Sequence, residues 1–429
     1  MTLRRVAVTG MGVVAPLGNS VEEFWNNLVA GRSGVHRLPS SISQGLRSPI
    51  GASANFEGKD YFEPPRLRLL DRVSQLALVA AQQAIAESRL DFAAEKRERC
   101  GVFVGTGMGG AETTEEGYHT LYAQQSDRIK PYSVLNAMTN APAAWIGIDY
   151  GLYGPMLTYS TACSSSAVAL GEAARRIQHG DVDVMLAGGA EAPLVVGVLR
   201  AWDAMRTLAT EDAHDPSTSC RPFAATRTGL VLGEGAAFVV LEDWDHALAR
   251  GAIIHAELAG YGLTSDVAHI TRPTVEGQAK AMQSALLAAH LEPEGIEYIN
   301  AHGTATLQND VVETAAIKVV FGEGAHNIPV SSTKSMHGHL LGAAGALEFV
   351  ITALSLTRGI VPPTMHLDAP DRACDLDYVS GHARVARLQI AMSNSFAFGG
   401  TNAVLILKAV PEAIPASVPC SVKWGDGNG

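Results

Sequence analysis

One pattern occurs twice in this chain: a strand that ends in a tight turn and is followed by a small-residue helix. In the first half a strand-like segment stops before Cys163, and in the second half residues 328–332 stop before a turn rich in Lys and His. Each helix leads to another strand that ends in small residues, at 187–190 and at 398–401. A repeated βαβ pattern predicts an α/β fold of two related halves that divide near residue 250.

Cys163 is the most reactive side chain at these turns. It is expected at the beginning of a helix, where unpaired backbone N–H groups and the positive end of the helix dipole both favour the thiolate. The following helix has apolar residues at helical spacing and ends at Gly180. Because the thiolate is the nucleophilic form, the pattern makes Cys163 a candidate nucleophile that needs no dedicated base.

Two further strand ends carry basic residues. His302 follows a short strand at 298–301, and Lys334 and His339 follow the strand at 328–332. Catalytic groups of α/β proteins gather at such strand ends. A single His is more often structural, but a Cys and two His residues placed in the same way favour a shared catalytic site.

Composition excludes several functions. The net charge of −11 argues against a nucleic-acid partner, and the chain has no run of about eighteen apolar residues that would predict a membrane span. The N-terminus lacks the apolar stretch of a signal peptide, and five scattered cysteines favour a reduced, cytoplasmic protein. No residues have zinc-ligand spacing, so no metal is expected, and the Gly-rich segment 105–110 lacks the Lys of a phosphate-binding loop.

Four separated blocks carry a resemblance to a known family. They lie at 161–165, 302–306, 334–339 and 394–402, and they resemble, in order, the motifs of the β-ketoacyl-acyl-carrier-protein synthases, in particular the elongating, type II-like branch. The likeness extends from about residue 3 to about residue 410. It implies an α/β thiolase fold, five-layered (αβαβα), from two duplicated halves at 1–250 and 251–410. A tail follows at 411–429.

The resemblance also implies a reaction. Members of this family join an acyl thioester to malonyl-acyl-carrier protein by decarboxylative Claisen condensation, giving β-ketoacyl-carrier protein and CO₂. Cys163 would carry the acyl group, while His302 and His339 would stabilise the enolate. Lys334 would tune the histidines, and Glu313 is expected to pair with Lys334 so that no isolated charge is buried. No cofactor is implied beyond the phosphopantetheine that carries the substrates.

Further positions are implied by the match to the family. The backbone N–H groups of Cys163 and Phe398 would form the oxyanion hole, and the Phe398 side chain would gate the pocket. Substrate-contacting positions are Thr304, Thr306 and Thr271 for the pantetheine arm, and Met108 and Trp202 for the acyl pocket. Three positions depart from the family pattern: His337, interpreted as a neighbour and not a third catalytic His, Leu307 and Arg272.

The implied partner is an acidic acyl carrier protein, although this chain is itself acidic. Docking would therefore need a local basic surface, and the positions that match are Arg68, Arg128 and Arg206. The resemblance further implies a dimer, either of two copies or of this chain with another ketosynthase-like chain.

Three alternatives bear on function. A non-catalytic chain-length factor would lack the nucleophile, so the presence of Cys163, His302 and His339 argues against it. A thiolase acting on coenzyme A would have a second Cys near the C-terminal Gly loop, and residues 393–401 contain none. An active ketosynthase subunit paired with a chain-length-factor-like chain stays open, as does the choice between fatty acid and polyketide or polyene synthesis.

Overall fold

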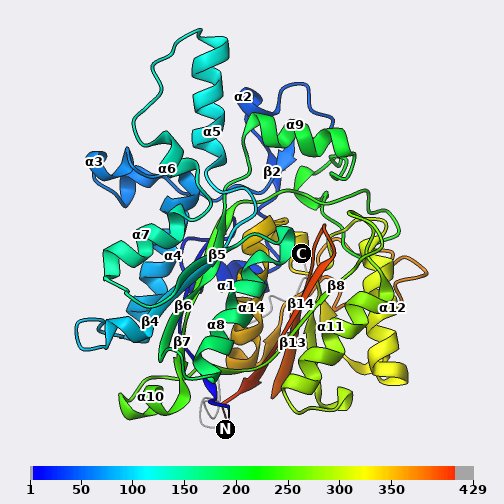
Figure 1. The fold of residues 1–429 in the computed structure, drawn as a ribbon. Helices are drawn as coiled ribbons and strands as arrows, with labels where there is room; N and C mark the ends of the chain where they lie inside the picture. The colour runs from blue at the N-terminus through cyan, green and yellow to red at the C-terminus, as the bar shows by residue number, and fades with distance from the viewer. Residues whose placement is uncertain (1–2, 411–429) are drawn as a thin grey trace, which may run out of the picture.

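The structure of the protein is a computed structural model, and it describes residues 3–410. The tail expected at 411–429, with Cys420 in it, lies outside the described residues. One ten-stranded mixed sheet, in the order β10-β9-β13-β14-β8-β1-β7-β6-β4-β5, runs through the molecule (Figure 1). Its strands are β1 (Val6–Val14), β4 (Cys100–Gly105), β5 (Met156–Tyr159), β6 (Val184–Glu191), β7 (Gly235–Asp243), β8 (Ala256–Ser265), β9 (Tyr298–Asn300), β10 (Val330–Ser331), β13 (Ile390–Phe396) and β14 (Thr401–Ala409).

The sheet contains the same arrangement twice. In the first half of the chain, β5, β4 and β6 pair in parallel, and β7 and β1 follow in antiparallel. In the second half, β10, β9 and β13 pair in parallel, and β14 and β8 follow in antiparallel. A short antiparallel contact, with Val8 opposite Ala256, joins β1 to β8. The predicted duplication is thus confirmed.

Helices cover both faces of each group of strands. The middle layer consists of α8 (Ser165–Gln178) and α14 (Ala344–Arg358), which pack between the two groups in one continuous core. α4 (Arg72–Ser88) and α7 (Ala141–Tyr150) cover the outer face of the first group, and α11 (Val275–Ala288) and α12 (Asn309–Phe321) that of the second. These are the five layers αβαβα that the resemblance implied.

The remaining elements border these layers. They are α1 (Val21–Val29), α2 (Ser40–Ser43), α3 (Pro64–Leu67), α5 (Ala111–Tyr118), α6 (Ser133–Ala137), α9 (Val196–Met205), α10 (Trp244–Ala249), α13 (Lys334–His337), β2 (His36–Arg37), β3 (Ile50–Gly51), β11 (Ile360–Val361) and β12 (Arg384–Val385). In Figure 1, α5 projects from the body of the molecule.

The central strands follow from their sequences. β1, β6 and β7 are buried along their whole length, as expected for apolar strands that helices cover on both sides. Gly12 of β1 allows α4 to approach closely, because a Cβ there would lie 1.9 Å from the carbonyl oxygen of Ala80.

The second reactive turn differs slightly from the expectation. The small-residue helix expected directly after the Lys- and His-rich turn begins only at Ala344, after a 3₁₀ turn at Leu341–Ala343. By length and hydropathy the stretch Leu341–Arg358 could cross a membrane, but 89% of it is buried inside the protein. It is the central helix of the core.

Candidate active site

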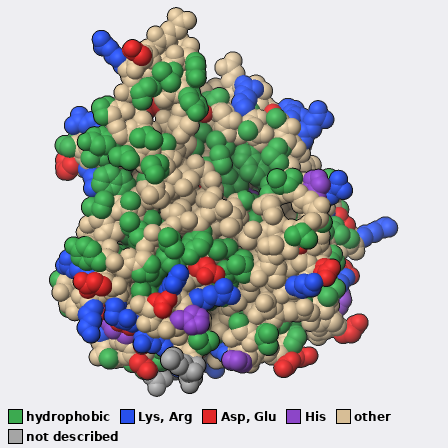
Figure 2. Space-filling view, in the orientation of Figure 1, with side chains coloured by type: hydrophobic (Ala, Val, Ile, Leu, Met, Phe, Trp, Pro, Cys, Tyr) green, Lys and Arg blue, Asp and Glu red, His purple; other side chains and the backbone are tan. Residues whose placement is uncertain are grey.

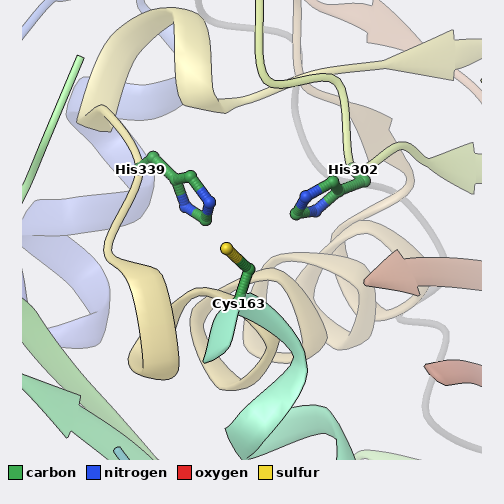
Figure 3. A group of neighbouring side chains, drawn as sticks. All are labelled: Cys163, His302 and His339. Atoms are coloured by element: carbon green, nitrogen blue, oxygen red, sulfur yellow. The ribbon is translucent and has the colours of Figure 1, made fainter. Parts of the chain in front are cut away.

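Three side chains from separate segments meet at the end of the central helix layer. Cys163 lies in the 3₁₀ turn before α8, His302 follows β9, and His339 precedes α14 (Figure 3). The Cys163 Sγ and one ring nitrogen of each His all lie within 4.8 Å of one another. The two rings stand edge to face, with centroids 5.4 Å apart. All three residues are at most 5% exposed, so the predicted cluster is brought together in a nearly dry site.

The turn at Cys163 is sharply bent. Ala162, the residue before it, has a φ of +52°, which is unusual for a residue with a Cβ and occurs most often where the surrounding structure enforces it. The hydroxyl of Ser165 donates to the Ala162 carbonyl at 2.6 Å and accepts from the Thr161 N–H at 2.9 Å. These contacts fix the direction of the thiol.

The ionisation of Cys163 differs from the expectation. Burial raises the pKa of the thiol to about 12, and the nearby Lys334 and a hydrogen bond from the Phe398 N–H only partly oppose this. Burial therefore opposes the effect of the helix N-terminus on the thiol. The absence of a dedicated base for Cys163 stays a prediction.

His302 is held through its backbone and one ring nitrogen. Its N–H donates to the Glu313 carboxylate at 2.8 Å, and its carbonyl accepts from Lys334 Nζ at 2.7 Å. Lys334 Nζ also lies 3.4 Å from His302 Nδ1. Because an ammonium can only donate, Nδ1 accepts and the ring proton sits on Nε2. Burial, and then Lys334, lower the His302 pKa well below its usual value, so the ring is neutral.

His339 is held by its backbone alone. Its N–H donates to the Val231 carbonyl at 2.7 Å, and its carbonyl accepts from the Gly233 N–H at 2.9 Å. Neither ring nitrogen has a hydrogen-bond partner in the described protein. Burial, and then Lys334, lower the His339 pKa well below its usual value. A neutral, unpartnered imidazole therefore faces the thiol.

The expected ion pair between Lys334 and Glu313 is wrong. Lys334 instead pairs with Glu348 of α14, and both side chains are at most 1% exposed. Glu313 accepts from the backbone N–H groups of His302 and Gly303, each at 2.8 Å, and thus supports the His302 loop. One signal for Glu348 was present in the sequence: it is a lone carboxylate in the middle of an apolar helix.

A cavity of about 300 Å³ leads to the three residues. Cys163, His302 and His339 lie at its buried end, while Arg206, Arg272 and Leu307 are exposed at the other end. The wall between contains the predicted arm-contacting residues Thr304, Thr306 and Thr271 together with Phe398. The cavity thus has the form of a tunnel with threonine hydroxyls in its wall and a reactive end.

The predicted acyl-pocket residues lie elsewhere. Neither Met108 nor Trp202 lines this cavity. The Trp202 ring stacks on Phe398 with centroids 6.0 Å apart and borders the apolar cluster around Cys163. Met108 is 41% exposed. An acyl pocket at these two residues stays a prediction.

His337 is separate from this cluster. It is fully buried, with Nδ1 2.8 Å from the Gly338 carbonyl and Nε2 3.0 Å from the Thr333 hydroxyl. Both ring nitrogens are therefore engaged, which agrees with its interpretation as a neighbour of the catalytic pair.

Basic residues in and beside the predicted docking segments fall into two groups. Some belong to internal ion pairs, namely Arg66 with Asp149, Arg72 with Glu234 and Lys130 with Glu116. The predicted docking residues Arg68, Arg128 and Arg206 are exposed and form no ion pair among residues 3–410, and the same holds for Arg272, which sequence reasoning had not assigned to docking. Of these four, Arg206 and Arg272 line the cavity.

Comparisons with known proteins agree with this geometry. The chain matches the N-terminal domain of the β-ketoacyl synthases over residues 3–247 and their C-terminal domain over residues 255–368. It is 44% identical to nodulation protein E of Rhizobium meliloti (95% of this chain, 100% of the relative). It is 41% identical to 3-oxoacyl-(acyl-carrier-protein) synthase 2 of Staphylococcus aureus (94% and 98%).

Solved structures are similar over the same span. A β-ketoacyl synthase from Burkholderia phymatum superimposes with a TM-score of 0.88 at 39% identity, covering 95% of this chain and all of that one. The ishigamide ketosynthase/chain length factor superimposes with a TM-score of 0.89 at 34% identity, and the match again covers 95% of this chain and all of that one. The structure of a type II polyketide synthase acyl-carrier protein in complex with its ketosynthase gives a TM-score of 0.88 at 34% identity, with the same coverage of both chains.

Proposed function

The chain belongs to the β-ketoacyl synthase family and is a condensing acyltransferase, and we propose that it performs this chemistry with Cys163, His302 and His339. The observation that carries the proposal is their convergence at the buried end of a tunnel whose wall includes three threonines. The tunnel suits a pantetheine arm, because threonine hydroxyls can bond its amides.

Acyl transfer to Cys163 is the first step. The Cys163 Sγ attacks the carrier thioester, a new S–C bond forms, and the S–C bond to the carrier breaks. With a pKa raised by burial, the thiol gives its proton to a base as it attacks. His339 fits this role by position, because its ring nitrogens have no protein partner, although its lowered pKa makes it a weak base and the transfer costly. The proton then passes to the departing carrier sulfur.

Decarboxylation of the malonyl group is the second step. The C–C bond to the carboxylate breaks, CO₂ leaves, and the electron pair moves onto the thioester oxygen. His302 Nε2–H and a ring N–H of His339 donate to this oxygen. Both rings are neutral, so each donates a hydrogen bond without losing its proton, and the dry surroundings strengthen both bonds.

Condensation completes the cycle. The enolate carbon attacks the Cys163 thioester, whose carbonyl oxygen accepts from the N–H groups of Cys163 and Phe398. The new C–C bond forms, the S–C bond breaks, and the released thiolate takes up one proton from solvent, which restores the thiol. The Phe398 backbone amide lies near enough to the thiol to lower its pKa, which supports this oxyanion-hole assignment.

An acyl carrier protein and a second ketosynthase-like chain are the partners that fit. The unpaired arginines at the cavity mouth suit an acidic carrier, and one similar solved structure is a ketosynthase with its carrier. β5 is an edge strand of the sheet, and its Met156 and Leu157 are each 45% exposed. Figure 2 shows further apolar side chains over α5, α6 and α7. This surface suits a partner chain.

The partner chain decides between two versions of this function. Two copies would form a homodimer of the kind expected for an elongating synthase in fatty acid or polyketide synthesis in the cytoplasm. A chain-length-factor-like partner would make it the active subunit of a heterodimer, and a ketosynthase/chain length factor pair is among the similar structures. Sedimentation of the chain purified alone, together with its activity, separates the two.

Loading and decarboxylation assays test the residue assignments. Cys163→Ala should abolish acyl transfer to the protein, measured by mass spectrometry, while Cys220→Ala, a change at another buried cysteine, should not. His302→Ala and His339→Ala should suppress malonyl-carrier decarboxylation by about a hundredfold or more. Acyl transfer that persists in Cys163→Ala, or normal decarboxylation in either His variant, would remove that residue from the mechanism.

A further inference from the structure

Cys163, His302 and His339 together form a metal donor set that the linear sequence conceals. Zinc binds thiolate sulfur and imidazole nitrogen, and sites with three protein ligands keep the fourth position open. Among residues 3–410 this is the one group of three or more His, Cys, Asp or Glu whose ligand atoms converge within 4.8 Å. The three residues come from distant segments, so no ligand spacing is visible in the chain.

A second observation points to a ligand. Both ring nitrogens of His339 lack a hydrogen-bond partner although the residue is only 1% exposed. Figure 3 shows the two rings and the thiol directed toward one common point. The cavity reaches this point from the surface, so an ion from solvent can enter.

Fixed charges of both signs surround the cluster. Glu191 and Glu348 are fully buried near Cys163, and Lys334 is a buried ammonium that acts on all three residues. The two carboxylates favour a cation at the thiol, whereas the ammonium opposes one at the histidines.

We propose that Cys163, His302 and His339 bind a zinc-type divalent cation that inhibits the enzyme reversibly. On binding, the Cys163 thiol loses its proton to solvent, a sulfur–metal bond forms, each imidazole gives one lone pair, and water occupies the open position. No electron is transferred. Zinc ligands lie about 2.0–2.3 Å from the ion, so the three atoms must draw together from their present spacing.

One contact in the site opposes metal binding, and removing it provides a further test. Lys334 donates toward His302 Nδ1, which keeps the ring proton on Nε2. A metal on Nε2 moves that proton to Nδ1, where it faces the ammonium. Lys334→Gln should therefore tighten metal binding, because the amide removes a positive charge and its oxygen can accept from Nδ1–H.

Inhibition is the part of the proposal that rests on the proposed function. A metal held by these atoms would block acyl transfer to the sulfur and would occupy the nitrogens that the enolate needs. Binding itself does not depend on catalysis. Metal binding can therefore be measured even if the chain condenses no substrate. A failed condensation assay would not affect the metal-binding result, and a failed binding assay would not affect the proposed condensation.

Cobalt titration of the purified full chain is the test, with Co²⁺ as the spectroscopic probe. A thiolate-to-cobalt charge-transfer band is expected, with intense visible bands of tetrahedral geometry, and Zn²⁺ should displace both. Cys163→Ser should abolish the charge-transfer band, and His339→Ala should weaken binding by more than about tenfold. Lys334→Gln should strengthen it, once its far-UV circular dichroism shows that it is folded.

Matched controls separate this site from adventitious binding. His337→Gln, at a buried histidine outside the cluster, and Cys220→Ser should leave cobalt affinity within about twofold of the parent protein. Alkylation of Cys163 before the titration should remove the charge-transfer band. A band that persists in Cys163→Ser, or an affinity unchanged in both His339→Ala and Lys334→Gln, would overturn the proposal.

Discussion

Lys334 and Glu348 form a fully buried ion pair that joins α13 to the central helix α14. The same ammonium donates to the His302 carbonyl at 2.7 Å and lies 3.4 Å from its Nδ1. One buried cation thus links the middle of the core to the tautomer of a histidine in the site. Both the stability of the core and the position of the proton on the His302 ring therefore depend on Lys334.

Breaking this pair should therefore reduce both properties. Lys334→Met leaves Glu348 buried without a counter-ion, so the free energy of unfolding should fall by about 3–5 kcal/mol. The double variant Lys334→Met/Glu348→Met removes both charges and should recover most of that loss. Malonyl-carrier decarboxylation should stay low in both variants, because His302 loses the contact that holds its proton on Nε2.

Denaturant unfolding and a CO₂-release assay measure the two effects on the same samples. If the double variant regains normal decarboxylation together with stability, Lys334 serves the fold alone. If the double variant stays as unstable as the single variant, the loss of unfolding free energy in Lys334→Met does not come from an unpaired buried charge.

The sequence located the reactive residues because each lies in the segment that follows a strand, although α13 separates β10 from His339. Strand ends of one sheet meet in space whatever their separation along the chain, so Cys163, His302 and His339 could be placed together. The repeated pattern also predicted the two related halves, whereas the five layers were implied by the family resemblance.

Partners across the fold could not be predicted in this way. Glu348 and Glu313 are both helix carboxylates, and only packing decides which of them reaches Lys334. The high pKa of Cys163 arises from desolvation by many residues that are distant in sequence, whereas the helix N-terminus is a local feature. The exposure of Arg272 at the cavity mouth likewise depends on how its loop folds.

The pKa of Cys163 predicts how alkylation depends on pH. Below a pKa of about 12, the thiolate fraction rises about tenfold for each pH unit. The rate of Cys163 alkylation by iodoacetamide should therefore rise steadily between pH 6 and pH 10, about tenfold per unit. Mass spectrometry of the modified peptide measures it. A plateau near neutral pH would mean that the helix N-terminus and Lys334 outweigh burial.

Phe398 should act as a movable gate. It lines the cavity, is half-buried, stacks on Trp202, and precedes Gly399 and Gly400, which both have a φ of +86°. Phe398→Ala should lose about 0.5–1.5 kcal/mol of stability from the stacking contact and should change acyl-chain selectivity. A loss of about 3–5 kcal/mol with unchanged selectivity would identify Phe398 as core filler.

The unpaired arginines should bind the acidic carrier. Charge reversal at Arg68, Arg128, Arg206 or Arg272 should raise the KM for carrier-bound substrate by about twofold to fivefold each and should flatten its salt dependence. Effects should be largest at Arg206 and Arg272, which line the cavity. Arg387→Glu, at an exposed arginine away from the cavity, is the control. Unchanged kinetics in the combined variant would place docking elsewhere.

Glu191 connects the predicted acyl pocket to the turn after His339. Its fully buried carboxylate accepts from Gly107 and Gly342 N–H at 2.7 and 2.8 Å through Oε2, and from Met108 N–H at 2.9 Å through Oε1. The two segments are in close contact, because a Cβ on Gly342 would lie 2.5 Å from Gly107 N. One carboxylate therefore fixes the position of Met108 relative to the end of the tunnel.

Glu191→Gln should remove the hydrogen bond from the Met108 N–H and leave the bonds from the two glycines in place. The amide oxygen of the new Gln side chain can keep the hydrogen bonds from the Gly107 and Gly342 N–H groups. The NH₂ group of that side chain then faces the Met108 N–H, and two donors cannot form a hydrogen bond. We expect a loss of about 1–3 kcal/mol in stability and an altered ratio of kcat/KM between long and short acyl chains. Met108→Ala tests the route: if Glu191 acts through Met108, the two changes should not add. Glu242→Gln, at another fully buried carboxylate, controls for the loss of a buried charge. Additive effects, or equal losses for every acyl chain, would show that Glu191 supports the fold without setting selectivity.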